Sequence, residues 1–290
     1  MLTVIIIAYK SDELVKKRIK EIGSKISILV IENSRNKTFK EEIERIYPNA
    51  KVIIPETNLG FGAGSNLGFK LSKTDYVFLT QPDLELIDNC IDKLIDCIKS
   101  FQDFTVITPM DIANKDHINY EIHFKKKKIS NNPFDLIEVD YVDLSWLINM
   151  KNFNQNDYWD EKIFLYFEAL DFARRLRKNK RKIFISKKIN TFHLGSKSHQ
   201  EKYNYYANLN RNWHYNWSKF YYLKKHYGYL FALRSLLFFA IKTSIKYFYS
   251  LLTSGNSEKT KFLYAELSGM ISSILNKPSS YRPYKDVIHS

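Results

Sequence analysis

The stretch LTVIIIAYKS (residues 2–11) is a run of aliphatic residues that ends in a polar turn. A helical pattern of apolar residues follows it over positions 14–22. Because a short apolar run bounded by a turn is typical of a buried strand, these residues predict a strand, a loop and a helix in that order. The run is too short for a signal peptide and has no basic leader before it, which predicts a cytoplasmic protein.

The alternation of strand and helix continues through the first half of the chain. Further apolar runs occur at residues 26–31, 51–54, 76–79 and 105–109, with helical patterns between most of them. Such alternation indicates parallel βαβ units, whose ligands bind beyond the carboxyl ends of the strands. Three strands end in polar residues, at Ala8-Tyr9, Glu32-Asn33-Ser34 and Gln81-Pro82-Asp83. The sequence therefore predicts an α/β fold with a Rossmann-like, mostly parallel sheet flanked by helices, and three loops that meet at one edge.

The composition changes along the chain of 290 residues. The formal net charge is +14, yet residues 172–290 hold 23 Lys and Arg against 4 Asp and Glu, or +19, which leaves −5 for residues 1–171. Of the 44 aromatic residues, 21 fall in the last 90 positions. We therefore expect a catalytic domain over residues 1–200 and a basic, aromatic, helical extension over residues 201–290. Cys90 and Cys97 lack a metal or redox spacing and are expected to be buried, neutral thiols.

The segment NLGFGAGSNLG (residues 58–68) contains four of the nine glycines and runs from a strand end into a helix. Glycines let the backbone approach a ligand closely, and a helix N-terminus favours an anion. The glycine spacing is not that of a dinucleotide-binding fingerprint. A phosphate-binding turn and a purely structural turn both remain open.

Three further positions carry groups suited to catalysis or metal binding. Asp83 follows a strand, where a carboxylate can hold a divalent cation that bridges a diphosphate, or can simply cap a helix. A helix is expected from about Tyr166 to Lys178. Glu168 and Asp171 share one face at its start, where either can act as a general base or complement the helix dipole. His193 follows a strand near residues 183–186 and suits a metal or phosphate contact, or a structural role.

The order and spacing of these pieces over residues 2–228 resemble family 2 glycosyltransferases of the GT-A fold, particularly the bacterial rhamnosyltransferase-like branch. Residues 58–68 are similar to the family signature Asn-x-Gly-Phe-(Gly/Ala)-x-x-x-Asn-x-Gly, and Gln81-Pro82-Asp83 to its Asn-Pro-Asp metal motif. The tail motifs Arg-Asn and Lys-His-Tyr-Gly are matched at residues 211–212 and 224–228. The resemblance implies a nucleotide-sugar site formed by Ala8, Tyr9, Glu32, Asn58, Gly60, Phe61, Gly62, Asn66, Gln81 and Asp83. It also implies that Asp83 and His193 hold Mn²⁺ or Mg²⁺.

The segment from Trp159 to Arg175 resembles the part of the family that supplies the catalytic base. Ala169 stands where relatives have the Asp usually assigned that role, and Leu144-Ser145 stands where a Gly-Ala pair is common. We therefore hypothesise that Glu168, or in second place Asp171, deprotonates the acceptor.

The resemblance implies an inverting hexosyl- or rhamnosyltransferase. Its donor would be a nucleotide sugar, with dTDP-rhamnose and UDP-hexoses leading, and its acceptor a saccharide, expected to be lipid-linked, in bacterial surface polysaccharide synthesis. An alternative is a catalytically degenerate relative that only binds a nucleotide or partner, because Gln81 and Ala169 both depart from the family. A nucleic-acid-binding function leaves the strand-end motifs unexplained, so no nucleic acid is expected.

Residues 229–253 are strongly apolar, but Arg234, Lys242 and Lys246 interrupt them, and a spanning helix needs about 20 predominantly apolar residues. On a helix, one arc would hold Ser235, Lys242, Thr243, Lys246 and Ser250, and the opposite arc Leu236, Leu237, Ala240, Tyr247, Phe248 and Leu251. This pattern predicts a helix that lies peripherally on an anionic membrane surface, at the inner face of the cell membrane. Packing on the catalytic domain or within a homodimer is the alternative.

Overall fold

The computed structural model describes residues 2–113, 119–122, 132–195 and 204–283. The chain divides into two compact units. The first comprises Met1–Trp159 and Ala169–His199, and the second comprises Asp160–Glu168 and Gln200–Ser290. The short segment Asp160–Glu168 thus groups with the C-terminal part, although it lies well before the predicted boundary at residue 200.

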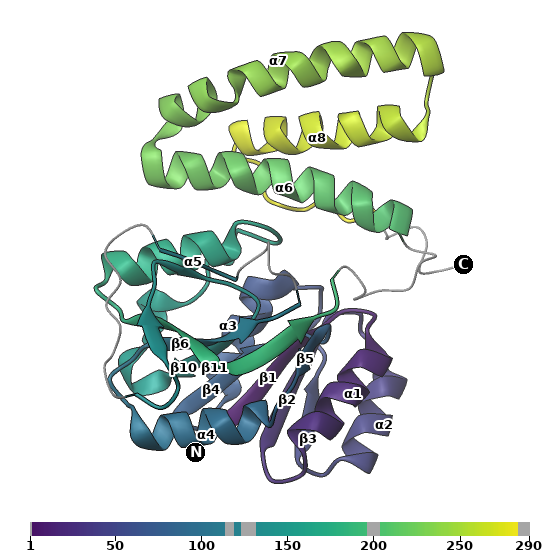
Figure 1. Ribbon diagram of the computed structural model, residues 1–290. Helices are drawn as coiled ribbons and strands as arrows, with labels where there is room; N and C mark the ends of the chain where they lie inside the picture. Colours follow the sequence, from purple (N-terminus) through teal and green to yellow (C-terminus); the bar gives the residue numbers. More distant parts are fainter. Residues whose placement is uncertain (1, 114–118, 123–131, 196–203, 284–290) are drawn as a thin grey trace. The chain divides into compact units, whose positions relative to one another are not determined.

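A nine-stranded sheet forms the centre of the first unit (Figure 1). Its strands are β1 (Leu2–Ala8), β2 (Ser27–Glu32), β3 (Ala50–Ile53), β4 (Tyr76–Thr80), β5 (Leu84–Leu86), β6 (Val106–Asp111), β8 (Leu136–Glu138), β10 (Trp146–Asn149) and β11 (Ile183–His193). They run in the order β3-β2-β1-β4-β10-β6-β11-β5, and β8 pairs with β11. The pairings among β1 to β4 and between β6 and β11 are parallel, whereas β10 lies antiparallel between β4 and β6. β11 also pairs antiparallel with β5 and β8. The predicted α/β fold with a large sheet is therefore confirmed, but the sheet is mixed, with four parallel and four antiparallel pairings.

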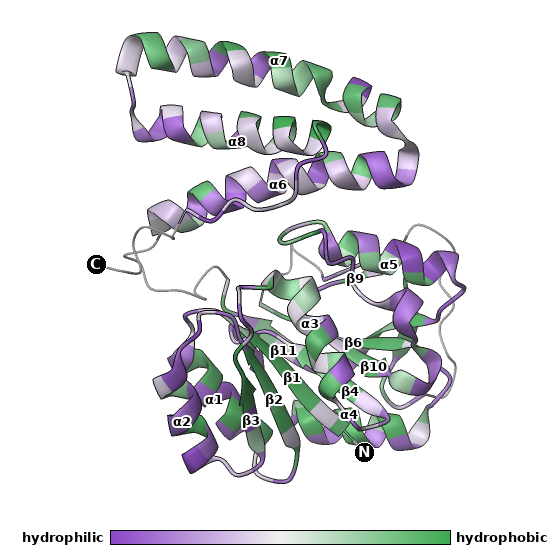
Figure 2. Cartoon of the chain, turned by 180° about the vertical axis from the view of Figure 1, so that it is seen from behind, coloured by the Kyte–Doolittle hydropathy of each residue, from purple (hydrophilic) through white to green (hydrophobic). Residues whose placement is uncertain are grey.

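Helices cover both faces of this sheet. They are α1 (Asp12–Ile22), α2 (Lys37–Ile46), α3 (Gly60–Leu71), α4 (Cys90–Ser100) and α5 (Glu168–Lys178). Because successive side chains of a strand point to opposite faces, Val4 and Ile6 pack in a cluster with α1, α2 and α4, whereas Ile5 and Ile7 pack in a cluster with α3 and α5. Figure 2 shows the apolar strands between helices whose outer sides are hydrophilic.

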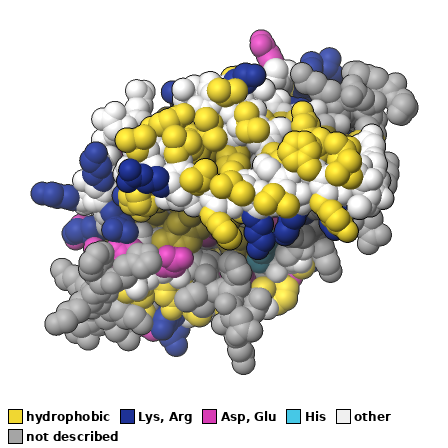
Figure 3. Space-filling view, turned by 90° about the horizontal axis from the view of Figure 1, so that it is seen from above, with side chains coloured by type: hydrophobic (Ala, Val, Ile, Leu, Met, Phe, Trp, Pro, Cys, Tyr) yellow, Lys and Arg dark blue, Asp and Glu magenta, His cyan; other side chains and the backbone are white. Residues whose placement is uncertain are grey.

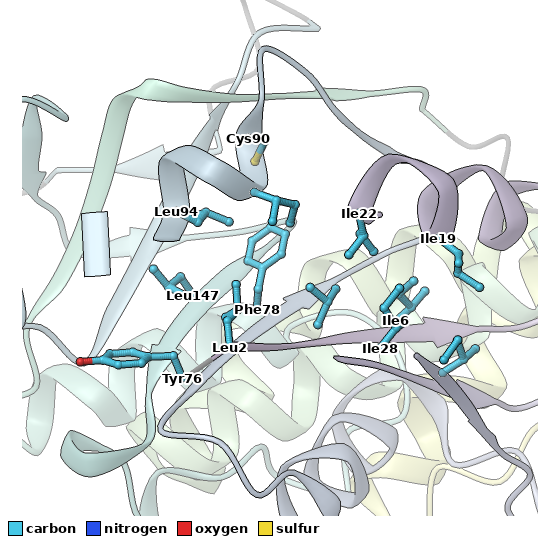
Figure 4. Close-up of a cluster of buried hydrophobic side chains, with 14 of the residues drawn as sticks. Leu2, Ile6, Ile19, Ile22, Ile28, Tyr76, Phe78, Cys90, Leu94 and Leu147 are labelled. Carbon is cyan, nitrogen blue, oxygen red and sulfur yellow. The ribbon is translucent and has the colours of Figure 1, made fainter. Parts of the chain in front are cut away.

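The cluster beneath α1 and α4 also contains both cysteines. Figure 4 shows Phe78 of β4 among side chains that include Ile19 of α1 and Leu94 of α4. Cys90 and Cys97 are free and buried, and burial raises the pKa of each thiol to about 12. The prediction of buried, neutral thiols is confirmed.

Two predicted element boundaries were wrong. The helix expected from residue 166 begins at Glu168, because Tyr166 and Phe167 have left-handed φ angles of 64° and 65° that a right-handed helix does not allow. The strand expected to end at residue 186 continues after a bulge to His193, so this histidine ends a strand rather than lying in a loop. A separate small sheet pairs β7 (Tyr120–Glu121) with β9 (Tyr141–Val142), and short 3₁₀ turns occupy Met150–Asn152 and Gln155–Asp157.

Three long helices form the second unit. They are α6 (Asn204–Tyr227), α7 (Tyr229–Ser254) and α8 (Glu258–Ile274). The segment 160–168 is bonded to α6: the Asp160 carboxylate accepts a hydrogen bond from the Tyr221 hydroxyl (2.9 Å) and pairs with Lys225 Nζ (2.6 Å). The Ser218 hydroxyl also donates to the Leu165 carbonyl at 2.8 Å. These bonds account for the grouping of this segment with the C-terminal helices.

Packing divides the two predicted arcs of α7. Thr243 and Ser250 of the polar arc are buried, whereas Leu237 and Phe248 of the apolar arc are exposed. The physical reason is that α7 packs through small and hydroxyl side chains, which let a neighbouring helix approach closely. No helix among the described residues is both long and apolar enough to cross a membrane.

Substitution of Gly269 should weaken the contact between α6 and α8. A Cβ at this position would lie 2.2 Å from the Trp213 carbonyl oxygen, so the Gly269→Ala variant must push the two helix backbones apart. We expect the free energy of unfolding to fall by about 2 kcal/mol, the usual cost of overpacking a core. Chemical denaturation of this variant, compared with Ser272→Ala on the same helix, provides the measurement. Equal stability of the two variants would contradict the close crossing.

Acid should destabilise the second unit through His214. Its buried ring lies 2.8 Å from Ser279 Oγ and 2.9 Å from the Tyr281 carbonyl oxygen, and burial lowers its pKa from the usual 6.5 to about 3. Below pH 6.5 the unfolded chain therefore binds a proton that the folded chain does not, so stability falls as the pH drops. At pH 5 this should lower the free energy of unfolding by about 2 kcal/mol.

Denaturant titrations followed by circular dichroism at pH 7 and pH 5 test this expectation. Because carboxylates also titrate in this range, the informative quantity is the difference between the native chain and His214→Gln. The variant should lose about 2 kcal/mol less between the two pH values. The same pH dependence in both proteins would show that His214 is protonated in the folded state.

Candidate active site

The carboxyl ends of β1 and β2 lie side by side at one edge of the sheet. Ala8 pairs with Glu32 in the parallel register, and the Asn33 backbone N–H donates to the Ala8 carbonyl at 2.9 Å. The Lys10 N–H donates to the Ser34 hydroxyl at 3.3 Å, which joins the two loops. Tyr9, partly exposed, lies in this joined loop. The structure therefore brings together three residues of the predicted nucleotide-sugar site: Ala8, Tyr9 and Glu32.

Glu32 is a fully buried carboxylate within this edge. It accepts hydrogen bonds from both the backbone N–H of Ser34, at 2.6 Å, and the Ser34 hydroxyl. Burial raises the pKa of Glu32, which the bonds from Ser34 partly offset. A carboxyl group fixed in this way has a defined direction and can serve as a polar recognition group for a heterocyclic base.

Asn33 ties the glycine-rich segment to the same edge. Its Oδ1 accepts from the Leu59 N–H at 3.0 Å, and its Nδ2 donates to the Gly60 carbonyl at 3.3 Å. Gly60 has a φ of 73°, which glycine adopts without strain, and its N–H donates to Asn58 Oδ1 at 2.9 Å. Asn33 belongs to one of the polar clusters at strand ends but was not predicted as a site residue. Its position directly after a parallel strand was the feature of the sequence that indicated such a role.

Asn66 has a positioning role within the first unit. Its amide donates to the Trp159 carbonyl at 2.9 Å and accepts from the Trp159 N–H at 3.0 Å, and its side chain is buried. Phe61 packs against Trp159 and Trp146, with ring centroids 5.3 and 5.5 Å apart. Through these contacts, Asn66 and Phe61 fix the position of Trp159 against α3. Both residues of the motif therefore have a packing role in the first unit.

The glycines of α3 allow the helix to pack closely on the sheet, in addition to leaving room for a ligand near the backbone. A Cβ at Gly68 would lie 2.8 Å from Ile5 Cγ2, and one at Gly64 would contact Ile7 and Ile31 at ordinary distances. Gly62 is also buried in this helix. The small residues therefore let α3 lie directly on β1 and β2, with the start of the helix next to the loop from Asn58 to Gly60.

Asp83 and His193 form an acid–imidazole pair at the same edge. His193 pairs with Leu84 across β11 and β5, and the Leu194 N–H donates to the Asp83 carbonyl at 3.0 Å. This places His193 Nε2 3.5 Å from Asp83 Oδ2. The hydrogen bond with Asp83 raises the pKa of His193, against the opposing effect of burial. Within the described residues, the buried Asp83 Oδ1 has no hydrogen-bond partner.

These two side chains fit a divalent cation. A buried carboxylate oxygen without a partner and a nearby imidazole are suitable ligands for Mn²⁺, and the carboxylate suits Mg²⁺ as well. Among the described residues, no group of three or more His, Cys, Asp or Glu side chains could hold a metal ion. A cation at this pair would therefore need further ligands, which the oxygens of a diphosphate can provide.

Two residues that were not predicted as site residues hold Asp83 and His193 in place. Asp111 ends β6, and its Oδ1 accepts from the His193 N–H at 2.9 Å. Arg18, fully buried on α1, donates to the Leu84 carbonyl at 3.0 Å, directly after Asp83. The sequence could have indicated both residues. Asp111 is a polar residue at the end of a strand, as are several of the predicted site residues. Arg18 lies on the same helix face as the apolar residues Val15, Ile19 and Ile22, which predicts that it is buried.

Gln81 braces a strained loop rather than pointing freely into solvent. Its Nε2 donates to the Leu144 carbonyl at 3.2 Å, and the Leu144 N–H donates to Asp143 Oδ1 at 2.7 Å. Leu144 has a φ of 73°, a conformation that costs a bulky residue about 1–3 kcal/mol. Glycine would adopt this conformation without that cost.

The two carboxylates of α5 have different environments. Asp171 is completely buried, and its Oδ2 accepts from Arg175 Nε at 2.8 Å as one half of an ion pair. Glu168 is the first residue of the helix and is partly exposed. A buried carboxylate already paired with arginine suits helix packing. Glu168 is partly exposed as a residue, although its Oε2 is buried, and its place at the helix start suits contact with a substrate.

Residues 3–175 match the profile of glycosyl transferase family 2. The low-salt glycan biosynthesis hexosyltransferase Agl10 of Haloferax volcanii is 25% identical over 193 residues, which cover 61% of this chain and 62% of the relative. This chain therefore matches less than two thirds of that relative's length.

Solved structures share the fold at low sequence identity. The mannosyltransferase PcManGT of Pyrobaculum calidifontis, solved with GDP-Man and Mn²⁺, superposes with a TM-score of 0.55 at 8% identity, over 95% of this chain and 87% of the other. Residues 1–349 of S. aureus TarS in complex with UDP give a TM-score of 0.53 at 12% identity, over 95% and 92%. The family profile covers more than half of the chain, and its span includes the Asp83 motif and most of the edge described above. The chain belongs to glycosyl transferase family 2 and has its GT-A fold.

Proposed function

We propose that this protein is an inverting glycosyltransferase that moves a sugar from a nucleoside diphosphate donor to a hydroxyl group of a saccharide acceptor. The observation that carries the proposal is Asp83, a buried carboxylate with one oxygen unpartnered within the described residues, 3.5 Å from His193 at the edge where β1, β2 and β4 end. Family membership supports the same reaction. The alternative, a binding protein without catalysis, predicts donor binding without transfer.

The donor would lie along the edge from Glu32 to Asp83. Glu32, held by Ser34, and the turn at Tyr9 would recognise the nucleoside, and the backbone at Gly60 would let the diphosphate approach α3. A Mn²⁺ or Mg²⁺ ion held by Asp83 and His193 would supply charge neutralisation of the diphosphate. Asp111 and Arg18 would keep these two ligands in position.

Glu168 would act as the base of a single displacement. It accepts the proton of the acceptor hydroxyl as the oxygen attacks the anomeric carbon from the face opposite the diphosphate. The bond from the anomeric carbon to the diphosphate oxygen breaks, and the diphosphate leaves with the electron pair. Inversion at the anomeric carbon follows because attack and departure take place on opposite faces.

The donor class is proposed from the relatives. Agl10 is described as a hexosyltransferase, and the two solved structures hold UDP and GDP-Man. We infer a hexose donor, with dTDP-rhamnose as the remaining candidate. A lipid-linked saccharide in surface polysaccharide synthesis is the proposed acceptor, with the protein peripheral on the inner face of the cell membrane, as a monomer or a homodimer.

A thermal-shift screen tests the proposal first. UDP, dTDP, GDP and CMP are each added with and without Mn²⁺ or Mg²⁺, because a ligand that binds only the folded state raises its stability. A shift for one diphosphate that grows with metal is the expected result, followed by hydrolysis or transfer of the matching nucleotide sugar. Binding without any turnover would favour the degenerate relative, and no shift across the panel would overturn both.

A further inference from the structure

One face of α7 presents large apolar side chains to solvent. More than half of the exposed large hydrophobic side chains in the described part of the chain lie on this helix, and the exposed fractions reach 86% at Leu252 and 78% at Phe238. At 3.6 residues per turn, six of them fall within an arc of about 80°. We call these six the outer face of α7: Leu230, Phe238, Ile241, Ile245, Phe248 and Leu252.

The opposite side of α7 packs against its neighbours through several small or hydroxyl side chains as well as apolar ones. Its buried residues are Ala232, Leu236, Thr243 and Ser250, and the Ser250 hydroxyl lies 2.7 Å from the Thr260 hydroxyl of α8. A helix on a water-exposed protein normally buries its bulky apolar residues and exposes its polar ones. In α7, Leu236, Leu233 and Phe239 pack inward, yet most of the large apolar side chains are exposed, which indicates that an apolar partner covers the outer face.

The charge around the outer face identifies the partner. Lys242 and Lys246 lie next to one border of the outer face around the helix, and Arg234 lies within the arc of the outer face. All three side chains are exposed. Residues 204–283 hold 11 Lys and Arg against 2 Asp and Glu, a difference of +9. Figure 3 shows hydrophobic side chains spread across this surface with Lys and Arg side chains beside them. A second copy of the chain would bring the same positive charge to the same surface, whereas an anionic bilayer offers an apolar interior beneath negative phosphates.

We propose that α7 lies in the plane of an anionic lipid bilayer, with its outer face inserted at the boundary between headgroups and acyl chains. Such a helix enters by about 5–10 Å, and the long stems of Lys242 and Lys246 let their charges reach the phosphates. This agrees with the absence of a spanning helix among the described residues. It would bring the protein to a lipid-linked acceptor, but it does not depend on transfer activity.

Vesicle co-sedimentation without donor or acceptor tests the proposal. The vesicles contain equal parts of phosphatidylcholine and phosphatidylglycerol, and a second set contains phosphatidylcholine alone. The native chain should bind the anionic set, and binding should weaken with salt. The Ile241→Glu/Ile245→Glu variant should lose at least about tenfold in binding, because two charges would enter the apolar layer. Lys242→Gln and Lys246→Gln should each lose about fivefold.

Ile46→Glu is the matched control. Ile46 is a half-exposed residue of α2 in the first unit, so the same change there should leave vesicle binding unaltered. The circular dichroism spectrum of each variant shows whether its helices form. Anionic-vesicle binding that is unchanged in the folded Ile241→Glu/Ile245→Glu variant would overturn the proposal. So would a stable lipid-free dimer that this variant dissociates, because the outer face would then be a subunit interface.

An introduced cysteine reports insertion directly. Because Cys90 and Cys97 are buried and their thiol pKa is raised to about 12, a new exposed thiol reacts selectively with a fluorescent label. A polarity-sensitive label at Ile245→Cys should shift to shorter wavelength on adding anionic vesicles, and one at Ile46→Cys should not. No shift at position 245 while the protein is vesicle-bound would overturn the assignment to this face. Either failure would leave the proposed sugar transfer standing.

Discussion

Replacement of Asp83 by Asn is expected to lower the rate of sugar transfer by about 10²–10³-fold, the size of effect found when one electrostatic group of a transition-state site is removed. The carboxylate is buried, and its Oδ1 has no hydrogen-bond partner among the described residues, so its charge is free to bind a cation. An amide keeps the shape but removes that charge. The variant should also lose the metal-dependent part of the thermal shift that a nucleoside diphosphate produces.

Asp75→Asn is the matched control for this prediction. Asp75 directly precedes β4, whereas Asp83 follows the same strand at its opposite end, and the Asp75 side chain is half exposed beside Lys151. This control should transfer sugar at the rate of the native protein. In the absence of metal, the Asp83→Asn variant should unfold near the native temperature. Its ion pair within the described residues is with His193 at 3.5 Å, and Arg18, which Asp83 also attracts, keeps its pairs with Glu21 and Glu85. Native transfer rates in Asp83→Asn would remove Asp83 from the metal site.

The strand-end residues show how far the sequence predicts the site. Ala8, Glu32 and Asp83 follow apolar runs, and a parallel sheet brings such positions to one edge whatever else the fold contains. The pairing of His193 with Asp83 could not be predicted from the residues alone. It depends on β11 continuing past its bulge to lie antiparallel to β5, and no local pattern in residues 187–193 indicates that extension.

The features of the fold that could not be predicted from the sequence depend on contacts between residues far apart in the chain. β10 is four residues long and enters the sheet antiparallel between β4 and β6, a position that only the finished sheet determines. The side of α7 that packs depends on such contacts as well. A helical wheel groups residues by polarity, but the side that packs was selected by small side chains such as Ala232 and Ser250.

Replacement of Glu168 by Gln is expected to reduce the turnover rate by about 10²–10⁴-fold, the contribution of a general base. The amide keeps the size of the side chain but cannot accept the acceptor's proton at neutral pH. Asp171→Asn, one turn later on the same helix, is the matched comparison. There the buried ion pair with Arg175 is lost, so stability should fall by about 1–3 kcal/mol while most of the transfer rate remains below the unfolding temperature.

The two variants therefore separate catalysis from folding on a single helix. Turnover and donor affinity are measured at a temperature where both proteins are folded, and unfolding is followed separately in denaturant. A general base also gives the pH–rate profile an acidic limb, which Glu168→Gln should flatten and Asp171→Asn should keep. If Asp171→Asn instead abolishes turnover while Glu168→Gln retains it, the base is the buried carboxylate, and Arg175 must release it when substrate binds. If both variants retain the acidic limb, the base lies outside α5. Another carboxylate must then take the role of the Asp that relatives have at the position of Ala169.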